Sequence, residues 1–554
     1  MTGPTTSTAD IDGYVPFPDE RIEAYLEAGH WRNRPFHAII DAHAADRPDA
    51  PAVVGPNRTL TYADLAERTR EIGAAFLDAG IGKHDRVAVQ LPNCVGFVET
   101  FFACSRVGAI PVLLLPRHRE REVRHLVELT GARAVVTVAD PPGTDFDYVG
   151  LYDDLVADGS PITERVAVVL GEADAPAGWT ALGDLDGGTD PGSVAVNPND
   201  PGLMMLSGGT SGLPKAIPRT HNDYAYLWEH IADRMGVRPD WRLVPGVPLP
   251  HSFAFGYIMG AAVCGGAAVA VEPRLKPLPL MALIDRVGGD VTALIPKQLI
   301  DLLEHDRAGE YDLSTLEVVC SGGQKVPPDV TRRVTDRWGV GFCHVYGMGE
   351  GAQIFTAPDD PFEVQANTVG RPLSAGDELR IEDQDGDPVD QGDLGELVVR
   401  GPGVFTGYFR NPEANAEDFD AGGWFHTGDV FSRRADGNYQ VWGRLDDTIN
   451  RAGETIYAPA VEDALVEHPK IKSAGVIGVP DEALGERVGA FVVLEPGEAS
   501  LTREEVVEFF KEQGHAVYLR PELLEVVDEL PETTVGKIDR PALRERLTTE
   551  GGTG

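Results

Sequence analysis

Residues 206–224 read LSGGTSGLPKAIPRTHNDY and follow the apolar segment GLMML. Closely spaced glycines let successive backbone N–H groups converge on an anion, while Ser and Thr hydroxyls add donors and a lysine adds a point charge. The spacing differs from that of the common nucleotide loop, which has four residues between two glycines and then Gly-Lys-Ser/Thr. The stretch predicts a phosphate-binding loop, with a Gly-rich turn between a strand and a helix as the alternative. The predicted phosphate-binding residues are Ser207, Gly208, Gly209, Thr210, Ser211 and Lys215.

Outward from this loop, β-rich runs alternate with helical patterns from about residue 50 to 375, as in RVAVQLPN (86–93) followed by VGFVETFFACSRVGA (95–109). This alternation predicts parallel sheets covered by helices. After 375, short strands separated by Gly and Asp turns indicate a small antiparallel barrel or sheet. A compact tail of mixed pattern then predicts a separate α+β domain. We therefore expect domains at 1–445 and 446–554.

The composition narrows the class of protein. The 554 residues carry a net charge of −40, which disfavours nucleic acid and anionic membranes as partners and is also typical of solubility or adaptation to salt. The five cysteines form no CxxC pair and are expected to be buried thiols. The N-terminus lacks a secretory pattern, and the apolar run YIMGAAVCGGAAVAV (257–271) predicts a buried helix leading into a strand. We expect a cytoplasmic protein.

The motifs resemble those of a known superfamily. SGGTSGLPK is similar to the phosphate loop of acyl-adenylate-forming enzymes, which include acyl-CoA synthetases, firefly luciferase and nonribosomal adenylation domains. The extension IPRTHNDY resembles the stand-alone aryl-acid branch, such as 2,3-dihydroxybenzoate–AMP ligase of siderophore pathways. The resemblance runs from YVPFPDERIEAYLEAGHW to TTVGKIDR. It implies an α/β fold in which a large domain of two helix-covered sheets and a small β-barrel subdomain precedes a small, mobile α+β domain.

The nucleotide site that this resemblance implies uses several further motifs. VYGMGEG (345–351) presents Glu350, the family's Mg²⁺ ligand; one carboxylate suits Mg²⁺, which keeps phosphates and waters as its other ligands. The preceding residue is Gly349, where the superfamily commonly has Thr and the aryl-acid branch does not. Asp429 in GWFHTGDV matches the carboxylate that binds the ribose hydroxyls. The remaining predicted ATP-binding residues are Gly323, Gln324, Tyr346, Gly347 and Arg444.

The acid pocket departs from the family pattern. His251 is retained and implied to be catalytic, but Ser252 replaces Asn, Phe253 replaces Tyr and Gly256 replaces Ser in PLPHSFAFG. A buried hydroxyl without a partner costs about 1–3 kcal/mol, so the loss of polar groups disfavours 2,3-dihydroxybenzoate. We expect an aromatic or aryl-alkenoic acid instead, with unchanged specificity as the alternative. The pocket also includes Ser321, Gly322 and Gln353, whose amide is a candidate partner for an amino or hydroxyl group of the ring.

The C-terminal motifs imply a two-step reaction. Lys537 in TTVGKIDR matches the catalytic lysine, which bridges the substrate carboxylate and the nucleotide and offsets charge during attack on the α-phosphate of ATP. Asp446 matches the hinge about which the domain rotates before thiol transfer. Gly453 matches the glycine that packs against pantetheine. The neighbouring Thr455 stands where the branch usually has Lys.

The implied reactants are ATP, Mg²⁺, an aromatic acid and a thiol acceptor. The acceptor is a carrier protein's phosphopantetheine in siderophore or other secondary metabolism, or coenzyme A. Adenylation of a non-acyl acid such as nitrite and an inactive binding homologue remain alternatives, although Lys215, Glu350, Asp429, Arg444 and Lys537 are all retained. A monomer or a homodimer is expected.

Overall fold

The computed structural model describes residues 8–171, 174–207, 213–451, 454–481, 484–515, 517–531 and 538–550. The chain forms two compact units, which we call unit 1 and unit 2. Unit 1 comprises Met1–Leu379 and Val399–Phe425, and unit 2 comprises Arg380–Val398 and His426–Gly554. Arg444 and Asp446 both lie in unit 2. The predicted domain boundary at Asp446 stays a prediction.

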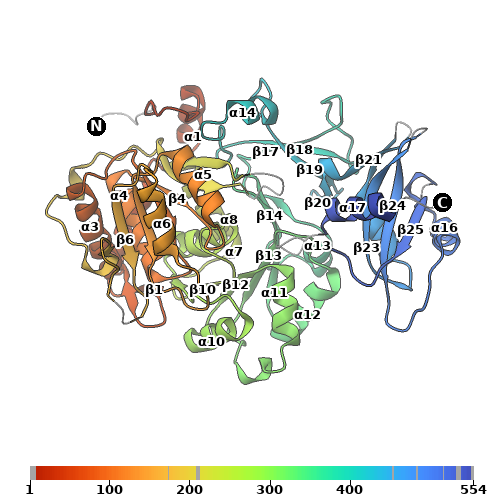
Figure 1. The fold of residues 1–554 in the computed structure, drawn as a ribbon, viewed down its shortest axis with the longest axis horizontal. Coiled ribbons are helices and arrows are strands. Elements are labelled where there is room, and N and C mark those ends of the chain that lie inside the picture. Colours follow the sequence, from red (N-terminus) through yellow and green to blue (C-terminus); the bar gives the residue numbers. More distant parts are fainter. Residues whose placement is uncertain are drawn as a thin grey trace. The chain divides into compact units, whose positions relative to one another are not determined.

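The first sheet of unit 1 has seven strands in the order β7-β6-β5-β3-β4-β8-β9. Two of them, β4 and β6, are labelled in Figure 1. Its pairs are parallel except for β8–β9, which is an antiparallel hairpin. The predicted phosphate loop therefore joins two strands, and the helix α7 begins only after β9. The strands are β3 (Arg86–Gln90), β4 (Ile110–Leu113), β5 (Ala134–Val138), β6 (Glu164–Val168), β7 (Thr180–Ala181), β8 (Pro201–Leu206) and β9 (Ala216–Thr220).

The second sheet of unit 1 has nine strands in the order β16-β15-β14-β13-β12-β10-β11-β1-β2. Its central pairs are parallel, from β11 to β14, and β15 and β16 add an antiparallel edge. The strands are β1 (Pro51–Val54), β2 (Thr59–Thr61), β10 (Arg242–Pro245), β11 (Ala268–Ala270), β12 (Val291–Leu294), β13 (Val318–Gly322), β14 (Gly341–Gly347), β15 (Gln353–Phe355) and β16 (Arg371–Pro372).

Helices cover both sheets, as the alternating sequence pattern predicts. Local signals set their starts: Thr61 and Asp64 form a capping box on α3, and the Thr220 hydroxyl accepts the backbone N–H of Asp223 at 3.0 Å on α7. The helices are α1 (Asp19–Glu27), α2 (Phe36–Asp46), α3 (Tyr62–Asp78), α4 (Val95–Val107), α5 (Glu120–Thr130), α6 (Tyr148–Ala157), α7 (His221–Met235), α8 (Ser252–Ala254), α9 (Ala261–Gly265), α10 (Pro277–Val287), α11 (Pro296–Glu304), α12 (Pro328–Trp338), α13 (Phe362–Asn367) and α14 (Pro412–Asp418).

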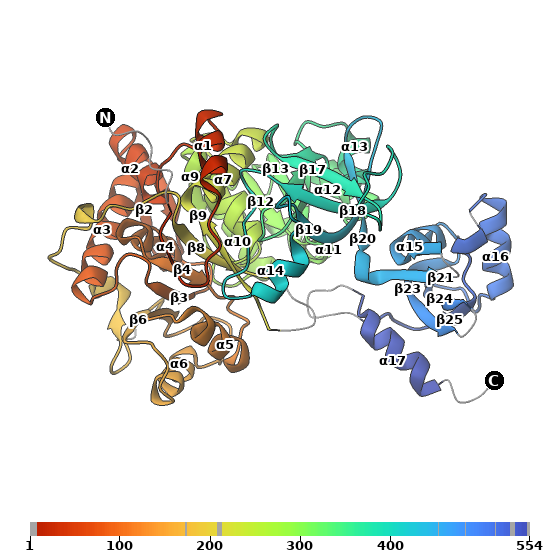
Figure 2. The same ribbon diagram turned by 90° about the horizontal axis from the view of Figure 1, so that it is seen from above.

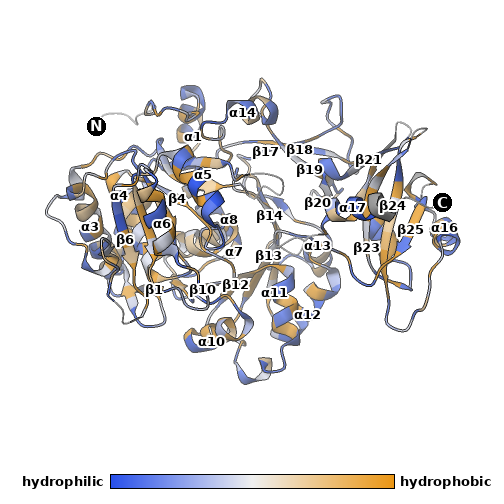
Figure 3. Ribbon diagram, in the orientation of Figure 1, coloured by the Kyte–Doolittle hydropathy of each residue, from blue (hydrophilic) through white to orange (hydrophobic). Residues whose placement is uncertain are grey.

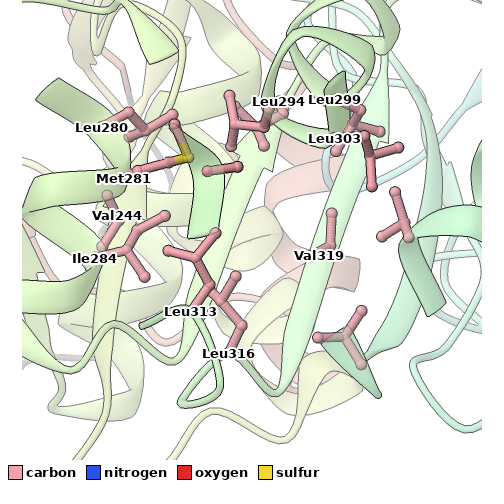
Figure 4. Packing of buried hydrophobic residues seen from close by; sticks show 14 of the residues in the cluster. Val244, Leu280, Met281, Ile284, Leu294, Leu299, Leu303, Leu313, Leu316 and Val319 are labelled. Atoms are coloured by element: carbon pink, nitrogen blue, oxygen red, sulfur yellow. The ribbon is translucent and has the colours of Figure 1, made fainter. Parts of the chain in front are cut away.

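The apolar faces of these helices build the core of unit 1. Figure 4 shows one cluster in which Met281 and Ile284 of α10 pack with Leu299 of α11 and with Val244 and Val319 of the sheet. Hydrophobic and hydrophilic segments both occur along α11 and α12 (Figure 3), as expected for helices that cover a sheet. The predicted buried segment at 257–271 is confirmed: a π-helix (Phe255–Gly260) continues into α9 and then β11.

Unit 2 carries two sheets. One has the order β17-β18-β19-β20 and is the sheet expected after residue 375; parts of β17 and β18 are assigned to unit 1. The other has the order β22-β21-β24-β23, with β25 on β24, and α15 packs on β23 (Figure 2). The elements are β17 (Glu378–Glu382), β18 (Gly395–Arg400), β19 (Phe425–Arg433), β20 (Tyr439–Arg444), β21 (Thr448–Arg451), β22 (Glu454–Tyr457), β23 (Ile471–Asp481), β24 (Gly485–Leu494), β25 (Leu523–Val526), α15 (Ala458–Val466), α16 (Arg503–Glu512) and α17 (Arg540–Glu550).

The five cysteines are free thiols; four are buried and Cys264 is half-buried. Within the described ranges, the search for membrane spans found no helix with the length and apolar character needed to cross a bilayer.

Candidate active site

The described ends of the predicted phosphate loop are joined by hydrogen bonds. Ser207 accepts the backbone N–H of Lys215 on its hydroxyl at 2.9 Å, and the Ser207 N–H donates to the Lys215 carbonyl at 3.0 Å. These bonds extend the β8–β9 hairpin and set the points at which the loop leaves and re-enters it. Gly208, Gly209, Thr210 and Ser211 lie outside the described residues.

The structure brings Lys215 and Glu350 together through Tyr408. The Lys215 ammonium lies 4.2 Å from the centroid of the Tyr408 ring, and the Tyr408 hydroxyl donates to Oε1 of Glu350 at 2.9 Å. Lys215 also donates to Oδ2 of Asp418 at 3.2 Å, and its side chain is about one-third exposed. A cation and a carboxylate from segments more than a hundred residues apart thus share one aromatic side chain.

Glu350 is buried, and burial raises the pKa of its carboxyl group above the usual range. The hydrogen bond from Tyr408 and the positive charges of Lys215 and Arg219 act in the opposite direction on this pKa. Among the described residues there is no cluster of three or more His, Cys, Asp or Glu side chains suited to a metal ion. A single carboxylate of this kind fits Mg²⁺, which prefers oxygen ligands and retains phosphates and waters in its shell.

Four predicted ATP-binding residues and the predicted pocket residue Gly322 gather where two parallel strands end. Gly322 closes β13 and pairs in register with Val345 of β14, and Tyr346 and Gly347 follow on β14. A Cβ at Gly322 would lie 2.1 Å from the Val345 carbonyl oxygen, so this strand pair requires glycine there. Carboxyl ends of parallel strands are the usual ligand edge of an α/β sheet. The exposed Gly323 and half-buried Gln324 follow directly on the loop after β13.

Gln353 is held in place by two hydrogen bonds. Its Oε1 accepts the hydroxyl of Tyr257 at 3.1 Å, and its Nε2 donates to the Met348 carbonyl at 3.1 Å. Tyr257 is buried and packs edge-on against Phe253, with ring centroids 5.5 Å apart. One lone pair and one hydrogen of the amide remain for other partners. The pairing of Gln353 with a ring substituent stays a prediction. It would use the remaining lone pair of Oε1 or the remaining hydrogen of Nε2.

The other acid-pocket residues lie on α8, the following π-helix and β13. His251 is exposed and accepts the Phe253 N–H on Nδ1 at 3.2 Å, which caps α8, and Ser252 is half-buried. A Cβ at Gly256 would only touch Ile231 at 3.5 Å, so a larger residue would fit. Ser321 is fully buried, and its hydroxyl has no hydrogen-bond partner among the described residues.

Asp429, the predicted ribose ligand, and Arg444, a predicted ATP-binding residue, are partners in unit 2. Asp429 and Arg444 are paired across β19 and β20, and Nη1 of Arg444 lies 3.1 Å from Oδ1 of Asp429. The Arg444 side chain is half exposed, whereas that of Asp429 is mostly buried. The predicted hinge residue Asp446 is exposed in a short 3-10 turn (Leu445–Asp447). Gly453 and Lys537 lie outside the described residues.

Three residues of these networks were not predicted from sequence. Tyr408 and Tyr257 have no distinguishing local pattern. Arg219 lies in the IPRTHNDY extension, and its place in this recognisable motif is the sequence signal that could have identified it. It is fully buried, and its Nη1 and Nη2 donate to the carbonyls of Gly349 and Gly403 at 2.7 and 2.6 Å.

The comparisons with known proteins specify the class of enzyme to which this α/β protein belongs. Residues 40–409 match the AMP-binding enzyme family and residues 460–537 match the AMP-binding enzyme C-terminal domain. The chain belongs to the AMP-binding enzyme family. It is an ATP-dependent acid–AMP ligase that resembles the stand-alone aryl-acid adenylating enzymes, which confirms the predicted superfamily and branch.

The most similar proteins include triostin synthetase I of Streptomyces triostinicus, which is 38% identical over 96% of this chain and 98% of its own length. Salicyl-AMP ligase of Mycobacterium tuberculosis is 38% identical over 97% and 95%, respectively. The 2,3-dihydroxybenzoate-AMP ligase of Bacillus subtilis is 34% identical over 97% and 98%. The apo structure of MbtA from Mycobacterium smegmatis superposes with a TM-score of 0.72 at 34% identity, covering 97% of this chain and 99% of that one.

Proposed function

We propose that this enzyme converts an aromatic or aryl-alkenoic carboxylic acid to its acyl-AMP, releases pyrophosphate, and then passes the acyl group to a phosphopantetheine thiol. The observation that supports the adenylation step is that Lys215 and Glu350 both contact Tyr408. Lys215 lies over the Tyr408 ring, and Glu350 accepts the Tyr408 hydroxyl. Lys215 and Glu350 are held on one aromatic side chain, and this arrangement of a cation and an anion is a preorganised environment for a metal-bound triphosphate. The names of the relatives, which include salicyl and dihydroxybenzoyl ligases, support an aryl substrate.

The residues divide the work of adenylation as follows. Ser207, Lys215 and the loop between them bind the β- and γ-phosphates. Asp429 binds the ribose, and Arg444 binds the ribose or a phosphate. Lys537 aligns the acid's carboxylate for attack on the α-phosphorus, and the bond from that phosphorus to the pyrophosphate oxygen breaks. Glu350 would hold Mg²⁺, which when bound would supply positive charge to offset the negative charge of the triphosphate.

The acid pocket favours a ring other than 2,3-dihydroxybenzoate. Phe253 and Tyr257 pack edge to face, and the Tyr257 hydroxyl donates to the amide oxygen of Gln353. The loss of the branch's Asn and Ser at Ser252 and Gly256 removes partners for two ring hydroxyls. A hydroxyl buried without a partner costs about 1–3 kcal/mol, which corresponds to about 5- to 150-fold in kcat/KM.

The proposal is tested by ATP–pyrophosphate exchange with benzoate, salicylate, anthranilate, cinnamate and 2,3-dihydroxybenzoate. We expect exchange with at least one aryl acid, and 2,3-dihydroxybenzoate below the best acid in kcat/KM. The highest kcat/KM for 2,3-dihydroxybenzoate would refute the pocket assignment. Exchange with no acid would refute the aryl-acid function, and nitrite is then the acid to test.

The acceptor is tested separately with the activated acid. Thioester formation on a phosphopantetheinylated aryl carrier protein, but not on coenzyme A, is the expected result; the reverse result would make the enzyme an aryl-CoA ligase. Rotation about Asp446, with Gly453 lining the thiol path, is the proposed link between the two half-reactions. A cytoplasmic location stays a prediction from the N-terminal sequence.

A further inference from the structure

Arg219 is a fully buried cation whose three guanidinium nitrogens all have partners. Its Nη1 and Nη2 donate to the carbonyls of Gly349 and Gly403, and its Nε lies 3.2 Å from Oδ2 of Asp223, four residues further along the chain. The guanidinium carbon also lies 4.7 Å from the centroid of the Tyr224 ring. The planar fork of arginine can satisfy two separate carbonyls at once, which an ammonium group does less well.

The two carbonyls belong to the segments that hold Glu350. Gly349 directly precedes Glu350, and the Glu350 carbonyl accepts the N–H of Phe405 at 2.8 Å, two residues after Gly403. On the other side of Glu350, a Cβ at Gly351 would lie 1.9 Å from the Gly403 carbonyl oxygen, so these backbones are in close contact. Arg219 therefore fastens both segments to β9, the strand that begins next to Lys215.

A buried arginine is a costly way to join two loops. Desolvation of the charge is unfavourable unless good geometry and an opposite charge offset it, and apolar side chains of similar volume are often equally stabilising. Here Asp223 supplies the opposite charge and is itself fully buried. Unlike an apolar side chain, the arginine forms directional hydrogen bonds, and these fix the orientation of the peptide that carries Glu350.

We propose that Arg219, supported by Asp223, is a positioning residue that orients the Glu350 carboxylate for metal-bound ATP. This inference deepens the proposed function and rests on the metal role of Glu350. Residues that orient a ligand through a hydrogen bond typically change metal affinity or activity by about 10- to 100-fold when substituted. Arg219 acts through the backbone at Gly349 and Gly403.

A matched control lies on the helix that follows β9. Arg234 of α7 also binds backbone carbonyls, donating to those of Phe355, Arg371 and Leu373 at 2.8–3.1 Å. It is half-buried, and its guanidinium carbon lies 4.8 Å from the centroid of the Phe355 ring. Its carbonyl partners lie on β15, on β16 and just after β16, not next to Glu350. Arg219→Lys and Arg234→Lys therefore remove equivalent backbone anchors at different places in unit 1.

The experiment uses electron paramagnetic resonance to measure the affinity of the full-length enzyme for Mn²⁺, which serves as the probe metal. The enzyme is saturated with ATP throughout. We expect Arg219→Lys to raise the Mn²⁺ dissociation constant by about tenfold and Arg234→Lys by less than about twofold. Asp223→Asn is a second variant expected to weaken Mn²⁺ in the same direction. The melting temperature of each variant, measured without ligand, shows how much of an effect is general destabilisation.

The outcomes separate this inference from the proposed function. Unchanged Mn²⁺ affinity in Arg219→Lys, or equal weakening in Arg219→Lys and Arg234→Lys, would show that Arg219 has only a structural role and would overturn the inference. Glu350→Gln is titrated alongside. If Glu350→Gln binds Mn²⁺ as tightly as the unchanged enzyme, the metal role of Glu350 fails, and the inference fails with it.

Discussion

At the scale of single residues, Glu350 shows how the chain keeps an anion in a buried position. Its carboxylate accepts the Tyr408 hydroxyl, its carbonyl accepts the Phe405 N–H, and Lys215 and Arg219 supply nearby positive charge. Burial alone favours the protonated form and raises the pKa of Glu350. A divalent cation would add to the effect of the two basic residues and favour the ionised form that binds it.

The two glycines that flank Glu350 give a prediction at this scale. Gly351 has a φ of +123°, and an added Cβ would lie 1.9 Å from the backbone oxygen of Gly403. At Gly349 the tightest contact is 2.9 Å to the end of the Ile217 side chain, which can move. Gly351→Ala should therefore lower stability by more than about 1 kcal/mol and shift the carboxylate enough to reduce exchange kcat/KM by about 100-fold.

Gly349→Ala is the matched control, with a small change in melting temperature and less than about a tenfold loss of kcat/KM. Melting temperatures and exchange kinetics of both variants check the prediction. Equal effects at the two positions would mean that the close approach of the backbones at Gly351 is unimportant.

At the scale of elements, the last helix of unit 2 is tied to the strand and helix beside it by one arginine. Arg540 begins α17 and donates to the Val476 carbonyl of β23, to Oδ2 of Asp447 at 3.1 Å and to Oε1 of Glu462 on α15 at 2.8 Å. Just before it, the Asp539 N–H donates to the Pro531 carbonyl at 2.8 Å. The chain that leads out of the predicted lysine loop is thus anchored next to the predicted hinge.

Breaking the ion pair between Arg540 and Glu462 should destabilise unit 2. Both side chains are mostly buried, and Arg540→Met leaves the Glu462 carboxylate without its counter-charge, at a cost of about 3 kcal/mol. Arg540→Met with Glu462→Gln should recover part of that loss, because a neutral amide can still accept the Val476 N–H at this position. Urea unfolding of the two single variants and the double variant measures the coupling. Additive losses would show that the pair contributes nothing beyond its separate contacts.

At the scale of the whole molecule, buried histidines link stability to pH. Burial lowers the pKa of His37, His118 and His344 to about 4 and that of His221 to about 3, from 6.5 in the unfolded chain. Between pH 6.5 and 4 the unfolded state therefore takes up these protons first, and stability falls as the pH falls. Burial also raises the pKa of Asp223 and Asp377 to about 6, which acts in the opposite direction over the same range. Because the pKa values of four histidines are lowered and those of two aspartates are raised, these histidines have a larger combined effect on the free energy of unfolding than these aspartates.

We therefore expect the unfolding free energy to decrease on acidification from pH 6.5 to 4. His118→Asn should make the slope shallower by up to about 1.4 kcal/mol per pH unit, because one proton no longer distinguishes the two states. Asp377→Asn should make it steeper by a similar amount. Urea unfolding midpoints at half-unit pH intervals test both variants. A His118→Asn slope equal to that of the unchanged enzyme would contradict the assignment of a depressed pKa to His118.

The sequence by itself determined the class of fold, the reaction class and the set of motif residues. Alternation of strands and helices follows local chemistry, so the strand at 86–90, the helix at 95–107 and the buried segment before β11 were predictable. SGGTSGLPK, VYGMGEG and TTVGKIDR are short motifs that can be located along the chain without knowledge of the fold. Their assignment to ATP phosphates, Mg²⁺ and the substrate carboxylate comes from resemblance, and the individual roles stay predictions.

Only the tertiary structure decided which side chains support those motifs. Arg219 meets Gly349 and Gly403 across 130 and 184 residues of sequence, and Tyr408 reaches Glu350 across 58. Tyr257 reaches Gln353 across 96 residues, which limits what the Gln353 amide can offer a substrate. Periodicity and motif spacing describe neighbours along the chain, whereas these partners are chosen by the packing of two sheets and their loops. Buried polar groups are nearly always hydrogen-bonded, and the fold determines which residue is the partner. The local sequence pattern does not contain that information.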